Sequence, residues 1–206
     1  MRELPMFPLG LVLLPGMVLP LRLFEPRYLQ MYADIIDSDR EFGVVLIERG
    51  IESRDDNPTF DIGCVAHVVG SGLNDDGTVG LVTMGRTRIR VTEWLPSDPY
   101  PLAVVEDLAD EQPGPPGDAA LLSARRRLPE LISLAGRLNP GSDYEVPDLS
   151  DDPTQSIYQL AQIAGLQTLD LQRVLETPTT DQRAALVDEL IEETEDLLRL
   201  QLKVDE

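Results

Sequence analysis

The chain contains few of the residue types on which nucleophilic and metal-dependent sites are built. Its 206 residues include a single cysteine, Cys64, a single histidine, His67, and a single lysine, Lys203. One cysteine cannot form a disulfide within the chain, which is typical of a reducing compartment such as the cytoplasm. One cysteine and one histidine are also too few for a zinc site. We therefore expect no metal site, no cofactor and a cytoplasmic location.

These same residues are poorly placed for catalysis. A nucleophile needs a base beside it, but Cys64 and His67 stand three residues apart in one expected strand, which puts their side chains on opposite faces. We interpret Cys64 as a small buried residue and His67 as a structural histidine. A Ser–Lys dyad would have to use Lys203 on the C-terminal tail, and a G-x-x-x-x-G-K-[ST] phosphate loop is absent. We expect no catalytic residues; a hydrolase with an acidic site is the least favoured alternative.

Basic residues and long apolar runs are scarce as well. The chain has 17 basic and 37 acidic residues, a net charge of −20, which repels phosphate backbones and anionic membrane surfaces. The apolar stretch Leu9–Leu23 is too short to span a bilayer and is interrupted by Pro15, Gly16, Pro20 and Arg22. We expect neither nucleic acid nor a membrane as partner. We interpret the acidity as a means of staying soluble, with a cationic partner as the alternative.

The first half of the chain contains short apolar segments separated by turn residues. This pattern predicts strands over 18–24, 42–47, 61–69, 78–84, 86–94 and 102–108. Residues 4–9 are expected to be extended, because residues before proline are pushed out of the α region. Asp76-Gly77 suits a hairpin turn, and Glu25-Pro26 opens a helix because proline is favoured at the first helical position. Residues 1–109 are therefore expected to form a β-rich lobe with one early helix.

The second half has a different composition and period. Residues 110–117 combine proline, glycine and acid, which indicates a linker. Beyond it the apolar period changes from two to about 3.6 residues, which predicts helices. Capping residues predict that these helices begin at Asp118, Asp152, Thr168 and Thr179. Pro129 should break or kink the first helix near position 127. Polar loops are expected over 53–58 and 139–151, and residues 118–206 should form an all-helical lobe of an α+β protein.

Three arginines form a candidate anion-binding stripe. Arg86, Arg88 and Arg90 alternate along one expected strand, with Thr87 and Ile89 between them. Guanidinium groups in such a row suit a carboxylate or a phosphate. The favoured interpretation is the outward face of a half-buried strand, paired with nearby acids.

Several motifs of the first half occur in an order that is similar to the N-terminal domain of the Lon proteases, which is also found as a stand-alone protein. They are Leu4-Pro5-Met6-Phe7-Pro8-Leu9, Leu14-Pro15-Gly16, Leu19-Pro20-Leu21, Phe24-Glu25-Pro26-Arg27-Tyr28, Phe42-Gly43-Val44-Val45, Ile62-Gly63-Cys64-Val65-Ala66, Asp76-Gly77-Thr78 and Gly85-Arg86-Thr87-Arg88-Ile89-Arg90-Val91. Each motif is weak by itself, and their common order is specific. The helical half is similar more loosely, through Leu160-Ala161 and Leu169–Glu176.

The resemblance implies a PUA-like β pseudo-barrel followed by an all-helical C-terminal bundle. It also implies a role in recognising protein substrates. Full-length Lon carries an ATPase module and a Ser–Lys peptidase, and this chain ends before either could begin. We therefore expect a non-catalytic module, not an enzyme, that binds unfolded or peptide segments of other proteins within a protease or chaperone system.

The expected peptide-binding surface lies between the two lobes and includes Phe24, Arg27, Tyr28 and Trp94. Exposed aromatic side chains anchor peptide interfaces, although aromatic residues are more often part of a core. The alternative function is RNA binding, which PUA-like barrels often perform, with the three arginines as phosphate contacts.

Overall fold

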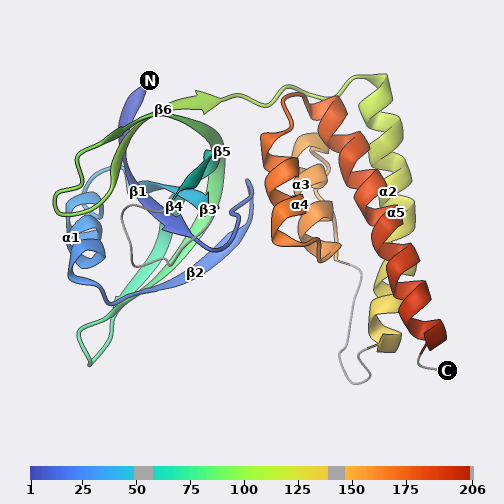
Figure 1. Ribbon diagram of the computed structural model, residues 1–206, viewed down its shortest axis with the longest axis horizontal. Coiled ribbons are helices and arrows are strands. Elements are labelled where there is room, and N and C mark those ends of the chain that lie inside the picture. Colours follow the sequence, from blue (N-terminus) through green and yellow to red (C-terminus); the bar gives the residue numbers. More distant parts are fainter. Residues whose placement is uncertain (49–57, 139–146, 205–206) are drawn as a thin grey trace. The chain divides into compact units, whose positions relative to one another are not determined.

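A computed structural model describes residues 1–48, 58–138 and 147–204, so most of the loops expected over 53–58 and 139–151 lie outside the described residues. Its contacts divide the chain into two compact units, Met1–Ala109 and Asp110–Glu206 (Figure 1). The described part of the first unit is mainly strand, and that of the second is helix and connecting segments. The mixed α+β class is thereby confirmed. No described helix is both long enough and apolar enough to cross a membrane.

The first unit contains one sheet. Its strands are β1 Arg2–Leu9, β2 Val18–Leu23, β3 Glu41–Ile47, β4 Thr59–Leu73, β5 Val79–Leu95 and β6 Leu102–Leu108. They lie in the order β2-β5-β4-β3-β1-β6, and β6 pairs in addition with β5. The pairing β5–β4–β3–β1–β6 therefore returns to β5, as the curved ribbons of Figure 1 show. Only β1 and β3 run parallel among these described pairs.

Side chains alternate between the two faces of this sheet, and each face has its own apolar cluster. One cluster takes Leu4 and Met6 of β1 together with Ile89 of β5 and Val105 of β6. The other takes Phe7 and Leu9 of β1, residues of β2, β3, β4 and β5, and the buried side of α1, which spans Pro26–Ile35. Because the strand period is two, a single strand such as β1 can serve both clusters at once.

Helix α1 begins where the sequence predicted. Glu25 is its N-cap residue and Pro26 its first helical residue. Its buried side chains are Tyr28, Met31 and Ile35, which recur at helical spacing. This row packs α1 against the sheet.

Strand β5 differs from the prediction, because residues 78–84 and 86–94 form one continuous strand. The sequence suggested a break at Gly85. In the structure Gly85 pairs with the turn before β2: its N–H donates to Met17 O and its carbonyl accepts from the Gly16 N–H, each at 2.8 Å. A Cβ at this position would collide with Leu14 O. The glycine therefore marks a close backbone approach and not a chain reversal.

The second unit contains α2 Pro115–Leu138, α3 Pro153–Ile163, α4 Thr168–Glu176 and α5 Thr180–Val204. Asp152 caps α3 as expected, since its carboxylate accepts from the Thr154 N–H, and Thr179 Oγ1 accepts from the Gln182 N–H at the start of α5. Thr168 is the first residue of α4 and Gln167 its cap, one residue before the prediction.

The prediction for α2 was wrong in two respects. The helix begins at Pro115, before the expected Asp118, and it continues past Pro129, so the expectation of a break is wrong. The alternative of a kink stays a prediction. Leu128 and Leu131 on either side of Pro129 are buried. Packing of these leucines offsets the missing N–H of the proline, so tertiary contacts override the local signal.

The segment expected as a linker is attached to the helical unit. Tyr158 Oη donates to Asp110 Oδ2 at 2.6 Å, and Arg183 Nη2 lies 3.2 Å from Asp110 Oδ1. The Gly114 N–H donates to Asp181 Oδ1 at 2.6 Å, and Pro115 is already helical. Residues 110–117 are therefore part of the folded second unit and not a free tether.

Candidate binding surface

Of the predicted peptide contacts, Phe24 and Tyr28 have opposite environments. Phe24 is 67% exposed directly after β2, as a surface contact would be. Tyr28 is 4% exposed, with its ring centroid 4.1 Å from that of Phe7. The expectation that Tyr28 forms part of the surface is wrong, because it faces the core together with Met31.

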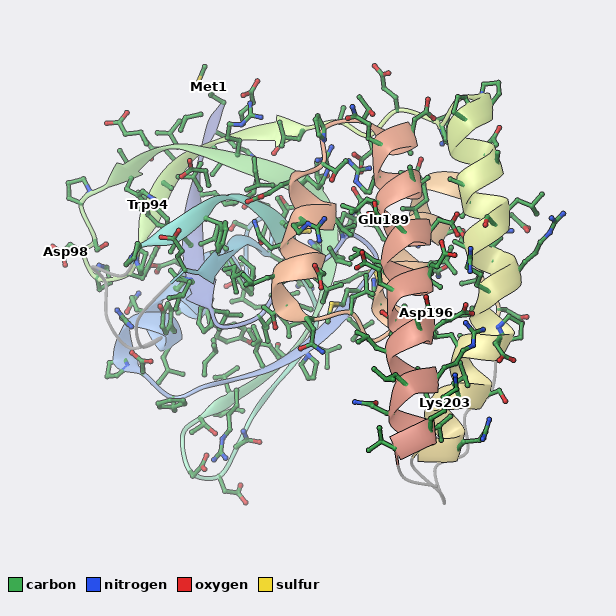
Figure 2. The ribbon with its side chains drawn as sticks, turned by 45° about the vertical axis from the view of Figure 1, so that its right-hand side comes forward. Met1, Trp94, Asp98, Glu189, Asp196 and Lys203 are labelled. Carbon is green, nitrogen blue, oxygen red and sulfur yellow. The ribbon has the colours of Figure 1, made fainter. Side chains whose placement is uncertain are left out.

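The side chain of Arg27 interacts with two neighbouring residues. Its Nε donates to Glu25 Oε2 at 2.9 Å, and its guanidinium lies 4.6 Å from the centroid of the Tyr28 ring. Trp94 is 40% exposed near the end of β5, on the side of the unit that carries Asp98 (Figure 2). Because Tyr28 is buried, the four predicted residues do not all lie on one exposed surface.

The three arginines do not form one stripe either. Arg86 and Arg90 are exposed, while Arg88 is only 3% exposed. Between the pairs Cys64↔Arg88 and Ala66↔Gly85 strand β5 has one residue more than β4, which is a β-bulge. This extra residue breaks the alternation on which the prediction relied. Arg90 Nη1 lies 3.8 Å from Glu106 Oε2, in agreement with the favoured interpretation of pairing with acids.

A different group of side chains forms a continuous exposed surface on the sheet. We call it the apolar face, and it consists of Val18, Pro20, Val69, Val82 and Met84. Val18 lies directly opposite Met84, and Pro20 directly opposite Val82. Directly opposite residues of antiparallel strands point to the same side of a sheet. Their chain neighbours Leu19 and Thr83 are buried on the other side.

Strand β4 completes this face. Met84 pairs with His67, and Val82 pairs with Gly70. The register shifts between Val68 and Gly70, and Val69 is the extra residue that the bulge turns outward. Exposed apolar side chains from β2, β5 and β4 are thereby brought together, which is the usual character of an interaction site.

A polar rim borders the apolar face on one side. His67 lies between Met84 and Glu41 in the ladder, and its Nδ1 is 3.9 Å from Glu41 Oε1. Glu41 also accepts a hydrogen bond from Arg2 Nη1 at 2.9 Å. An apolar centre with a polar border is the arrangement found in protein interfaces.

Two further residues considered from the sequence lie outside this face. Cys64 is buried, and Lys203 is exposed in the last turn of α5. No group of three or more His, Cys, Asp or Glu side chains in the described ranges could hold a metal ion.

Comparison with solved structures shows the fold of Lon N-terminal domains. The chain is similar to a Lon N-terminal domain protein from Xanthomonas campestris, with a TM-score of 0.65 and 23% identity over 89% of this chain and 95% of that one. It is also similar to the N-terminal domain of Mycobacterium avium complex Lon protease, with a TM-score of 0.64 and 18% identity over 93% and 98% of the two chains.

The family follows from the sequence match. The model of the ATP-dependent protease La (LON) substrate-binding domain matches residues 3–193, so the chain belongs to the LON substrate-binding domain family. Curated relatives include Lon protease 2 of Herpetosiphon aurantiacus, 26% identical over 97% of this chain and 25% of the relative, and Lon protease of Anaeromyxobacter dehalogenans, 28% identical over 98% and 24%. The chain spans about a quarter of the length of the curated relatives it matches. The resemblance noted from the motifs is confirmed.

Proposed function

We propose that this chain is a non-catalytic module that binds unfolded or peptide segments of other proteins. The observation that carries the proposal is the apolar face, present in a chain whose family is defined as a substrate-binding domain. Unfolded chains expose the apolar side chains that folded proteins bury, so a surface of this kind recognises them without a fixed sequence.

The size of the face predicts weak and reversible binding. Each buried apolar side chain contributes about 1.5–3 kcal/mol at most, and association costs a large part of that gain. Val82 and Met84 lie at the centre of the face, with Val18 and Pro20 on one side and β4 on the other. We therefore expect these two to contribute most.

The proposal also includes the type of barrel, the helical bundle and the cellular location of the module. The pairing of β5 with both β4 and β6 is what a PUA-like pseudo-barrel requires, and the helices of the second unit would be its C-terminal bundle. We assign the module to a cytoplasmic protease or chaperone system on the basis of its Lon relatives.

The RNA-binding alternative has little support. Three arginines were predicted to contact RNA phosphates. Of these, Arg88 is buried and Arg90 lies near Glu106. A net charge of −20 opposes phosphate binding over the whole molecule.

Fluorescence anisotropy with labelled, reduced and carboxymethylated α-lactalbumin tests the proposal. The unfolded probe should bind and the native form should not. Val82→Thr with Met84→Thr keeps strand propensity and removes apolar surface, and should raise Kd about tenfold. Leu169→Gln, at an exposed leucine of α4, is the matched control and should leave Kd unchanged. Equal affinity of the double variant and the control would refute binding at the apolar face.

A further inference from the structure

Strand β2 has one partner, whereas every other described strand has neighbours on both sides. Among the described strands, β2 pairs with β5 alone, while β1, β3, β4, β5 and β6 each pair with two or more strands. A strand edge without a neighbour presents backbone N–H and C=O groups that another extended chain can satisfy. The edge also borders the apolar face, since Val18 and Pro20 belong to both.

The hydrogen bonds of the ladder show which backbone groups face outward. The Gly85 N–H donates to Met17 O at 2.8 Å, and Thr83 Oγ1 donates to Leu19 O at 2.8 Å. The carbonyl groups of Met17 and Leu19 therefore face β5. Groups alternate in direction along an antiparallel strand, so those of Val18, Pro20 and Arg22 face away from it. Within the described ranges, no backbone hydrogen bond reaches these outward groups.

Proline fits this edge because its missing N–H falls on the outward side. The edge therefore offers the N–H groups of Val18 and Arg22 and the carbonyl groups of Val18, Pro20 and Arg22. Arg22 is neutralised locally, since its Nη2 lies 2.5 Å from Asp76 Oδ2. An occupant needs no charge to complement this edge.

We propose that an uncharged, extended segment of the bound protein adds to the outer edge of β2 as a further strand. Alternate apolar side chains of that segment lie beside Val18 and Pro20 and extend the rows Val18–Met84 and Pro20–Val82. This proposal rests on the proposed function and names the site and the class of segment: apolar at every second position and without proline where the edge offers a carbonyl.

A second copy of the chain is the competing occupant, and Pro20 argues against it. In an antiparallel pairing of two β2 strands centred on this residue, each Pro20 would oppose the other. Neither could donate to its partner, so the central pair would lack both hydrogen bonds. A segment from another protein has no such restriction.

Backbone N-methylation of a peptide tests the added strand without altering the protein. The probe is a fluorescein-labelled peptide of alternating valine and threonine, measured by anisotropy against the full chain. One derivative is methylated at two valine amides and the other at two threonine amides. Only one of these sets can face the edge, because amide direction and side-chain direction alternate together. One derivative should lose affinity more than tenfold, and the other should stay within about twofold.

The outcomes separate this proposal from the proposed function. Equal losses for the two derivatives, or no binding of the parent peptide, would overturn strand addition. Binding of unfolded α-lactalbumin that still depends on Val82 and Met84 would then leave the proposed function standing. A dimer in sedimentation that Val18→Pro dissolves and the peptide does not would assign the edge to self-association and overturn the proposal. Val18→Thr, which keeps the outward N–H, is the matched control for Val18→Pro in sedimentation.

Discussion

Two glycines of β4 differ in what surrounds them. A Cβ on Gly63 would collide with the backbone oxygen of Val44 and lie 2.7 Å from Val45 Cγ1, because β3 and β4 approach closely there. A Cβ on Gly72 would meet nothing within 4 Å. Backbone cannot move aside as a flexible side chain can, so the first position requires glycine and the second does not.

We predict that Gly63→Ala lowers the free energy of unfolding by at least about 1–3 kcal/mol, because the added methyl group overpacks the contact between β3 and β4. Gly72→Ala is the same substitution on the same strand and should change it by less than about 1 kcal/mol. Urea denaturation followed by the fluorescence of Trp94, the single tryptophan, measures both variants in the first unit. Similar stabilities for the two variants would contradict the close approach of β3 and β4.

Asp76 in the β4–β5 turn has a pKa below its usual value. The main cause is Thr78, whose Oγ1 donates to Asp76 Oδ1 at 2.7 Å and whose N–H donates to the same oxygen at 3.1 Å. These bonds favour the charged carboxylate. A lowered pKa in the folded state stabilises the turn above the unfolded pKa, and this contribution is lost as pH falls through the folded pKa.

We predict that Thr78→Val raises the pKa of Asp76 towards its ordinary value, because the hydroxyl donor is removed. Carboxyl carbon chemical shifts, recorded by NMR across the acid range, follow this titration directly. Thr87→Val, at an exposed threonine of β5, should leave the pKa of Asp76 unchanged. If the midpoint does not move in Thr78→Val, the hydroxyl hydrogen bond is not a cause of the lowered pKa of Asp76.

At the scale of the helix, Pro129 is a local cost that packing offsets. Proline has no N–H to donate to the carbonyl of Arg125, yet α2 remains helical from Pro115 to Leu138. We predict that Pro129→Ala raises the free energy of unfolding by about 1–3 kcal/mol. Ser133→Ala, at an exposed position in the same helix, should change it by less than about 1 kcal/mol. Thermal unfolding measured by ellipticity at 222 nm would show the difference, and a lower melting temperature for Pro129→Ala would refute it.

The elements were predictable from the sequence because their signals are local. The strand predicted over 102–108 is β6, and the helix opened by Glu25-Pro26 is α1. The burial of Tyr28 was also available from its spacing to Met31 and Ile35. Phe24 lies outside that row. Because Phe24 and Tyr28 belong to one sequence motif, they were wrongly expected to share one exposed surface.

The apolar face was not predictable because its signal is not local. Val18, Val69 and Met84 come from three strands, and only the pairing register brings them together. The face also depends on a bulge at Val69. A second bulge, before Arg88, is the reason that the three arginines do not form the predicted stripe. A shift of one residue reverses which face a side chain occupies, and nothing in the alternation of a single strand records such a shift.

For the whole molecule, each unit has a core of its own, and the second is organised around a buried arginine. The side chain of Arg183 is fully buried and lies 3.2 Å from Asp110 Oδ1, with its guanidinium 5.0 Å from the centroid of the Tyr158 ring. Its Nε and Nη2 donate to the carbonyl groups of Val174 and Thr177 at 3.2 and 2.8 Å. These contacts join α3, α4 and α5 to the first residue of the unit.

Replacing Arg183 therefore tests whether the two units unfold separately. We predict that Arg183→Met destabilises the helical unit by about 3–5 kcal/mol, since it leaves Asp110 with an uncompensated charge and removes the hydrogen bonds that Arg183 donates to two carbonyl groups. Arg173→Met removes an exposed i,i+3 ion pair with Asp170 and should cost less than about 1 kcal/mol. Urea curves should show a lower midpoint for ellipticity at 222 nm and an unchanged midpoint for Trp94 fluorescence, because Trp94 belongs to Met1–Ala109. If both midpoints fall together, the units form one cooperative structure, and a ligand bound to the apolar face would then stabilise the helices as well.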